Sequence, residues 1–221
     1  MLAVLVALAT GCGGRDAVST TAVTTTATRQ PPAGAAEALH RLAAVARTGD
    51  VAAVRRMLTP STRPSVAGEL VDGLGSFPAK TKVFLAEQID PAWAVAALAG
   101  PRRVEGAREY GSFAVALRLV RGSWKAEIGP AVSVRPLGPT PGSVKGRAPT
   151  QVAAEFSARA KIVQGGLWLD GSAIAGTTSG TARRFTAYGA SPILTPGPHV
   201  VVAFAEAGGH ATAVAWSFRV R

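Results

Sequence analysis

The sequence predicts a chain with two folded parts, a mixed α and β part followed by an all-β part. Hydrophobic residues recur at helical spacing where the first part begins, and then they alternate as in strands. In the second part, short alternating stretches between glycine and proline turns continue to the end of the chain. Helices followed by an antiparallel sheet indicate an α+β domain, and strands alone indicate a β-sandwich.

The composition excludes several classes of protein. The 221 residues are 48% hydrophobic and 17% charged, which is too apolar for a disordered chain. The longest apolar run, residues 1–9, is about half of what a bilayer-spanning helix needs. The net charge of +11 reflects either attraction to an anionic surface or the arginine-rich composition typical of a GC-rich genome. Basic pairs without interleaved aromatic residues do not predict specific nucleic-acid binding.

Residues 1–14 have the pattern of a secretion signal. The apolar run is followed by Thr10, Gly11 and Cys12, the only cysteine of the chain. A single cysteine excludes an intramolecular disulfide and a thiolate-rich zinc site. Small residues before a cysteine at the end of a short apolar run resemble the bacterial lipobox. This resemblance implies cleavage before Cys12 and a diacylglyceryl thioether on its sulfur, which would anchor the protein to the cell membrane outside the cytoplasm.

Two departures accompany this resemblance. Ala9 stands where the lipobox typically has leucine, and no charged residue precedes Arg15. The second departure leads us to expect a translation start further upstream. The alternative is a chance cysteine in an ordinary signal peptide. Residues 15–33, rich in threonine and serine and closing on two prolines, are interpreted as a tether that spans at most about 60 Å.

Residues 34–130 are predicted to form the α+β domain. Gly49 is expected to end the first helix and Asp50 to cap the second. Arg121 and Gly122 are expected to form a two-residue turn between the last two strands. Expected helices are residues 35–47, 51–58 and 65–74, and expected strands are residues 83–89, 93–97, 113–119 and 124–128.

This order of elements, with the motifs DPAWAVAALAG and FAVALRLVRGSWKAEI, resembles the NTF2-like (SnoaL-like) family. The resemblance implies helices packed on a cone-shaped sheet with a cavity. The family includes isomerases and dehydratases that pair an aspartate with a histidine or tyrosine. Candidates of these chemical types in this chain are His40, Glu87, Asp90 and Tyr110.

The sequence around each candidate favours a structural role for some of them and leaves alternatives for others. Asp90 precedes a proline, where a local turn contact is expected, and a lone histidine such as His40 on a helix is usually structural. Glu87 shares a row with apolar neighbours (Val83, Leu85 and Ile89), so it points either into a cavity or toward an arginine. Glu87, Trp93 and Tyr110 are the candidate cavity residues. Alternatively, Trp93 belongs to the core, as do Phe113 and Trp124.

Residues 131–221 are predicted to form the β-sandwich. Asp170 and Gly171 follow the stretch GLWL as a hairpin turn. The set P-x-P-G, LWLDG, L-x-P-G-x-H and W-S-F-x-V (residues 139–142, 167–171, 194–199 and 216–220) resembles bacterial immunoglobulin-like modules, including relatives of the copper-resistance sandwiches.

That second resemblance has its own departures. Glu206 stands where such modules often have aspartate, and His210 lies near where they often have asparagine. His199 occupies what the resemblance implies is a structural position. Copper sites of that family use an N-terminal histidine and clustered His and Met residues, which this domain does not have. We therefore expect no metal.

The functional hypothesis is a membrane-anchored cell-envelope lipoprotein that acts as a non-enzymatic binding or accessory module. The chain offers no Ser/His/Asp set, no nucleophilic cysteine and no Gly-rich phosphate loop, so neither a catalytic residue nor a cofactor is predicted. The expected partners are the membrane through the lipid, and an envelope protein or an anionic wall polymer. The alternative is a small hydrophobic ligand carrier or a weak isomerase-type enzyme that uses the NTF2-like cavity.

Overall fold

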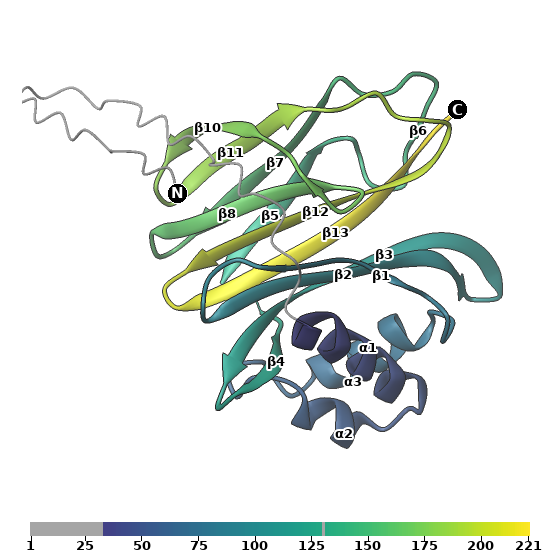
Figure 1. The fold of residues 1–221 in the computed structure, drawn as a ribbon, viewed down its shortest axis with the longest axis vertical. Coiled ribbons are helices and arrows are strands. Elements are labelled where there is room, and N and C mark those ends of the chain that lie inside the picture. The colour runs from purple at the N-terminus through teal and green to yellow at the C-terminus, as the bar shows by residue number, and fades with distance from the viewer. Residues whose placement is uncertain (1–32, 130) are drawn as a thin grey trace, which may run out of the picture.

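The computed structural model describes residues 33–129 and 131–221 (Figure 1). The predicted signal segment with Cys12, and residues 15–32 of the predicted tether, lie outside the described residues. Ala33, which the sequence interpretation placed in the tether, is the first residue of a helix.

Three short helices open the described chain. Asp50 caps the second helix as predicted, because its Oδ1 accepts a hydrogen bond from the backbone N–H of Ala53 at 2.8 Å. Gly49 precedes it with φ 76°, a conformation that favours glycine. The helices are α1 (Ala33–Arg47), α2 (Val51–Arg56) and α3 (Val66–Gly75).

An antiparallel sheet of four strands in the order β1-β2-β3-β4 follows the helices. The expected turn at Arg121 and Gly122 is confirmed, with φ 49° and 77°. The strands are β1 (Val83–Gln88), β2 (Trp93–Val104), β3 (Ala107–Val120) and β4 (Ser123–Glu127). β2 and β3 are longer than predicted, because they pair with each other as far as Val104 and Ala107, well past the end of β1.

The second part of the chain is a β-sandwich, as predicted. One sheet has the order β10-β11-β7-β5 and the other the order β6-β13-β12-β8-β9. Asp170 and Gly171 form the expected hairpin turn between β8 and β9, with φ 52° and 87°. The strands are β5 (Val132–Gly138), β6 (Val144–Lys145), β7 (Gln151–Ala158), β8 (Ile162–Leu169), β9 (Ser172–Ala173), β10 (Gly176–Thr181), β11 (Arg184–Ala190), β12 (Gly197–Ala207) and β13 (His210–Val220).

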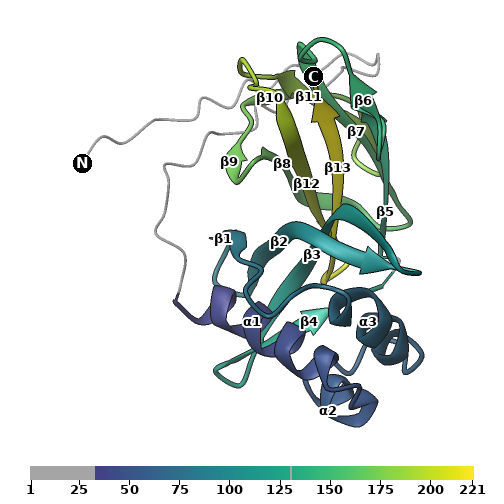
Figure 2. The same ribbon diagram turned by 90° about the vertical axis from the view of Figure 1, so that its right-hand side faces the viewer.

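The molecule is a stack of four layers, with the helices at one end and the sheet that holds β10 and β11 at the other (Figures 1 and 2). Three apolar cores join the layers. The first lies between the helices and one face of the β1–β4 sheet, and the second lies inside the sandwich. The third lies between the other face of the β1–β4 sheet and the outer face of β8, β12 and β13.

The middle layers are therefore buried on both faces. Along β12, Val200, Val202 and Phe204 face the β1–β4 sheet, and the alternate residues Val201 and Ala203 face the sandwich interior. All five are at most 3% exposed. A strand that is buried on both faces has a continuous apolar sequence, which explains the run VVVAFA at residues 200–205.

One predicted row of side chains is interrupted. The sequence places Val83, Leu85 and Glu87 on one face of β1, but the pairing of β1 with β2 shifts between Val83 and Leu85. Val83 packs against the helices, whereas Leu85 packs against the sandwich. The irregularity adds a residue to one strand, so the side chains before it change face.

Candidate functional site

A cleft is lined by residues of β8, β10 and β11 on one side of the sandwich. Figure 1 shows β8 beside the sheet that holds β10 and β11. We call this space the β8–β10 cleft. It has a volume of about 740 Å³, within the range of small-molecule sites. Its walls come from β8 and its neighbours, β10 and its neighbours, β11, the end of β1, and one residue of β12. The lining residues are 161–168, 173–176, 178, 180–182, 185, 187–189, 87–89 and Phe204.

Two backbone hydrogen bonds mark the ends of the β8 stretch that lines the cleft. At one end the N–H of Ile174 donates to the carbonyl of Leu167 at 2.9 Å. At the other end the N–H of Ile162 donates to the carbonyl of Ala182 at 2.8 Å. Between these two bonds the strands of the opposing sheets separate, and the space between them forms the cleft.

The walls consist mainly of small and apolar residues. Close packing explains two of the glycines, because a Cβ on Gly176 or Gly189 would lie within 2.6 Å of a neighbouring carbonyl oxygen. Gly165 is different, since a Cβ there would meet its nearest atoms, Phe185 Cζ and the Phe204 carbonyl oxygen, only at 3.4 Å. The charged residues among those that line the cleft are Glu87 and Lys161.

A polar rim joins the cleft to the β1–β4 sheet. Gln164 Nε2 donates to Glu206 Oε2 at 2.7 Å, and it also donates to the Asp90 carboxylate. Asp90 holds its own turn as predicted, because its Oδ1 accepts from the N–H groups of Ala92 and Trp93 at 2.7 and 2.8 Å. The rim therefore binds the turn before β2 to strands β8 and β12.

The three candidate cavity residues do not converge on one site. Glu87 pairs with Val95 in the sheet register, whereas Tyr110 pairs with Pro101, six residues or about 20 Å further along β2. The face that carried the predicted cavity is instead packed against β12 and β13. A cavity shared by Glu87, Trp93 and Tyr110 was the expectation, and the register of the sheet places Tyr110 far along β2 from the other two.

Each candidate has a definite environment. Glu87 Oε2 accepts a hydrogen bond from Trp168 Nε1 at 2.8 Å across the interface. Trp93 is 3% exposed in the third core, as its alternative interpretation predicted, and the Arg118 guanidinium lies 5.4 Å from its ring centre. Burial raises the pKa of Tyr110, and the nearby Asp170 carboxylate raises it further. His40 is exposed on α1.

His199 is structural in this fold, in agreement with the expectation. The residue is 7% exposed and its ring centre lies 5.4 Å from that of Phe218. Nδ1 lies 2.7 Å from Asp170 Oδ2 and Nε2 lies 2.8 Å from the Thr195 carbonyl oxygen. Both ring nitrogens are therefore engaged with the protein.

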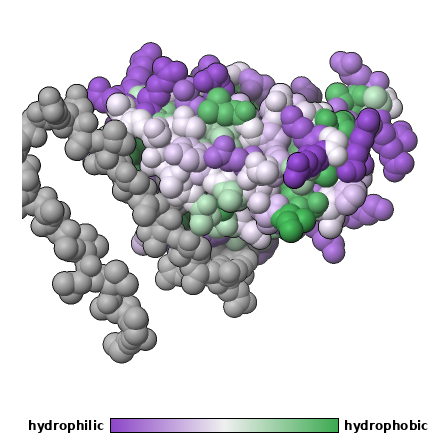
Figure 3. All heavy atoms as spheres, turned by 90° about the horizontal axis from the view of Figure 1, so that it is seen from above, coloured by the Kyte–Doolittle hydropathy of each residue, from purple (hydrophilic) through white to green (hydrophobic). Residues whose placement is uncertain are grey.

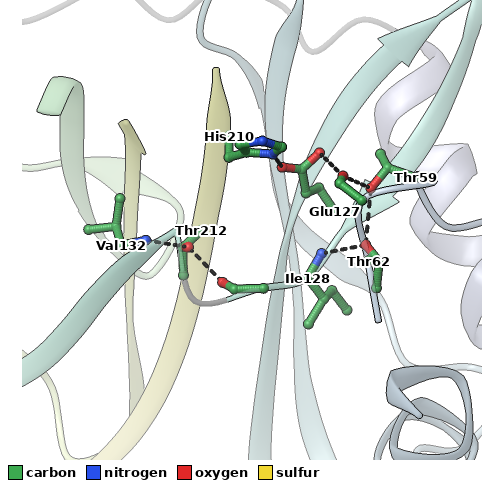
Figure 4. A network of polar contacts seen from close by, with 9 residues as sticks. Thr59, Thr62, Glu127, Ile128, Val132, His210 and Thr212 are labelled. Carbon is green, nitrogen blue, oxygen red and sulfur yellow. Dashed lines mark hydrogen bonds and ion pairs between the residues drawn. The ribbon is translucent and has the colours of Figure 1, made fainter. Parts of the chain in front are cut away.

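A second polar cluster lies where the two parts of the chain meet (Figure 4). The carboxylate of Glu127, 4% exposed, accepts from Ser61 Oγ at 3.3 Å and lies 2.7 Å from His210 Nδ1. Thr212 Oγ1 donates to the Gly129 carbonyl at 3.0 Å and accepts from the N–H of Val132. The serine contacts the carboxylate rather than the histidine, so this arrangement is not that of a nucleophile activated by a base. It joins β4, the connector to β5, and the start of β13.

Three properties of the described residues bear on ion binding, membrane insertion and surface contacts. Within residues 33–129 and 131–221 there is no group of three or more His, Cys, Asp or Glu side chains arranged to hold a metal ion. None of the helices in this part of the chain is long and apolar enough to cross a membrane. On the face seen in Figure 3, hydrophobic residues stand in separate patches among hydrophilic ones.

Sequence reasoning missed the cleft and its rim. The sequence does carry a signal for the packing of the two parts on each other. The apolar runs at residues 93–99 and 200–205 indicate strands that are buried on both faces. The cleft has no comparable signal, because its walls come from two hairpins whose separation is set by the packing of whole sheets.

The chain matches no protein-family model and no curated protein. Among solved structures it is similar to the crystal structure of CopC from Methylosinus trichosporium OB3b, to which it is 17% identical. The similarity covers 40% of this chain and 93% of that chain, with a TM-score of 0.30.

Proposed function

We propose that this protein is a cell-envelope lipoprotein, anchored through Cys12, that acts as a non-enzymatic binding or accessory module for a protein partner or wall polymer. The observation that supports the binding role is the β8–β10 cleft, a space of about 740 Å³ at the side of the sandwich that is lined by both apolar and polar groups and carries few charges. The anchor is supported by the apolar run, the small residues and the single cysteine that follows them.

Within this proposal, the helices and the β1–β4 sheet belong to the NTF2-like class and the sandwich to the immunoglobulin-like class. Helices followed by an antiparallel sheet support the first assignment. The order of strands in two facing sheets supports the second. In this arrangement the sheet face opposite the helices, which carries Trp93 and Val95, is covered by the sandwich.

The alternative is a carrier of small hydrophobic ligands or a weak isomerase-type enzyme. A carrier or enzyme that used the sheet face with Trp93 and Tyr110 would need that face to be open, whereas the sandwich packs on it. The observation that favours a carrier is the volume of the β8–β10 cleft, which lies in the range of small-molecule sites.

The anchor is tested by expressing the gene from its native upstream region and separating the membrane and aqueous fractions. We expect the wild-type protein in the membrane fraction, with an intact mass that begins at Cys12 and includes acyl chains. Cys12→Ala should be unmodified and leave the membrane fraction, because two or more acyl chains are what hold such a protein stably. Gly13→Ala keeps the cysteine and serves as the matched control. An unmodified wild-type protein in the aqueous fraction would overturn the anchor.

A further inference from the structure

We propose that the β8–β10 cleft takes one extended peptide strand of a partner protein, which adds to the outer edge of β8 through backbone hydrogen bonds. This inference rests on the proposed binding function and names the class of its partner. The proposal depends on three features: an open strand edge, a space of strand length, and walls with little charge.

Among residues 33–129 and 131–221, no strand pairs with the outer edge of β8 before Trp168. β12 pairs along one side of β8, whereas β9 pairs on the other side only at Trp168 and Leu169. The N–H of Asp170 donates to β12 and the carbonyl of Leu167 accepts from outside the strand, so successive residues alternate between the two sides. This alternation directs the N–H and C=O of Gly165 toward the cleft.

The opposite wall also ends in a strand edge. β10 has β11 on one side and is the outermost strand of its sheet. Along β8 the cleft lies between Ile162 and Leu167, whose backbone groups make the hydrogen bonds described above. About six residues of β8 lie along it, which corresponds to a length of about 20 Å. An inserted segment of five or six residues in extended conformation would match this length.

The walls select the side chains that such a strand can carry. Gly165, Ala173 and Ala175 leave room for small or β-branched side chains, and Val163, 60% exposed at the rim, offers an apolar contact. Uncharged partner residues fit, because an unpaired charge between these walls would lose hydration without gaining a partner. An alkyl chain would also fill the space, but it cannot pair with the backbone groups of Gly165, and this favours a peptide.

The experiment uses the full chain and a fluorescent peptide of six alternating valine and threonine residues, with one blocked lysine at each end for solubility. The matched probe is the same peptide N-methylated at its valines, which removes alternate N–H donors and keeps the side chains. Fluorescence anisotropy should show the unmodified peptide binding at least about tenfold more tightly. Since backbone pairing tolerates many sequences, no binding of the unmodified peptide, or equal binding of both, would overturn the proposal.

Two protein variants test whether the peptide binds at the outer edge of β8. Val163→Lys puts a charge on the open edge of β8 and should weaken peptide binding about tenfold or more. Val144→Lys makes the same change on β6, at the other edge of the same sheet, where Val144 is 49% exposed, and should leave binding within about twofold. Because both valines are exposed, both variants should keep the wild-type circular dichroism spectrum. An equal effect of the two variants would overturn this location.

A third probe separates failure of the strand from failure of the binding function. If dodecanoate binds in the cleft, weakened by Val163→Lys, and the peptide does not, the strand proposal fails and a binding role for apolar ligands stands. If neither probe binds, the binding function fails together with the strand. The membrane fractionation of Cys12→Ala reports on the anchor independently of both.

Discussion

Single polar residues join the two parts of the chain in addition to the apolar packing between them. Trp168 donates to Glu87 across the third core, Gln164 bridges the turn of Asp90 to β12, and His210 contacts the buried Glu127. Every buried side-chain nitrogen or oxygen within the described part of the chain has a hydrogen-bond partner. A hydrogen bond between the two parts is broken if they shift, and its stabilising free energy is lost. These contacts therefore favour one relative arrangement of the two parts.

Tyr110 should make the stability of the fold depend on pH in alkaline solution. Burial and the charge of Asp170 raise its pKa in the folded state, so the unfolded chain loses this proton first as pH rises. The stabilisation is complete below the usual tyrosine pKa of about 10 and is lost as pH rises through the folded value. Tyr110→Phe cannot ionise, so the free energy of unfolding of the wild type should fall relative to this variant above about pH 10.

Urea unfolding of both proteins at several pH values measures this difference. Asp170→Asn in the wild-type background should reduce the effect without abolishing it, because burial is the larger cause. A wild-type protein and a Tyr110→Phe variant whose stabilities stay parallel up to strongly alkaline pH would contradict the assignment.

At the level of elements, the β8–β9 hairpin adds contacts between the sandwich and the first sheet to those of β12 and β13. Its two-residue turn at Asp170 and Gly171 has positive φ at both positions. Asp170 Oδ1 accepts from the N–H of Val200, which ties the turn to β12. The turn lies against β1, because a Cβ on Gly171 would stand 2.7 Å from the Phe84 carbonyl oxygen. Glycine is required here for conformation and for space.

Gly171→Ala should therefore cost more stability than an alanine in a comparable turn. Gly122→Ala is the matched control, since Gly122 has φ 77° and nothing within 4 Å of its would-be Cβ. The control should lose about 1 kcal/mol from backbone strain alone, and Gly171→Ala about 2–3 kcal/mol from strain and steric overlap. Equilibrium unfolding in urea measures both. Equal losses in the free energy of unfolding of the two variants would mean that the hairpin turn is not tightly packed against β1.

At the scale of the whole molecule, the third core makes the stack cooperative. The β1–β4 sheet contributes Trp93, Val95 and Ala97 to it, and the sandwich contributes Val202 and Phe204. All five are at most 3% exposed. Neither part could expose this apolar surface to water without a large loss of free energy, so the two are expected to unfold together.

Val202→Asp tests that cooperativity. A charge in the third core, with no partner, should lower the free energy of unfolding by about 4 kcal/mol or more. Far-ultraviolet circular dichroism should show the helices melting earlier as well, although they lie at the far side of the other sheet. Val144→Asp, at an exposed edge position, should shift the midpoint little. Helices that melt at the wild-type temperature in Val202→Asp would show that the two parts unfold independently.

Local structure was predictable because it depends on residues close together in the chain. The helix break at Gly49, the cap at Asp50, and the turns at Arg121 and Asp170 each rest on a glycine or a short polar side chain at a fixed position. The extension of β2 and β3 was missed, because residues such as Arg102 and Glu109 there pair with each other instead of alternating with apolar residues.

The sequence alone determined the order of the elements, their turns, and the apolar surfaces that need burial. It did not determine which surfaces meet. The apolar face of the β1–β4 sheet can equally line a cavity or pack on a neighbour, since both satisfy the same pattern of residues. Only the tertiary structure placed β12 and β13 against that face, separated Glu87 from Tyr110, and left the open space beside Gly165. The reason is that contacts between sheets join residues far apart in the chain, and local sequence patterns do not specify them.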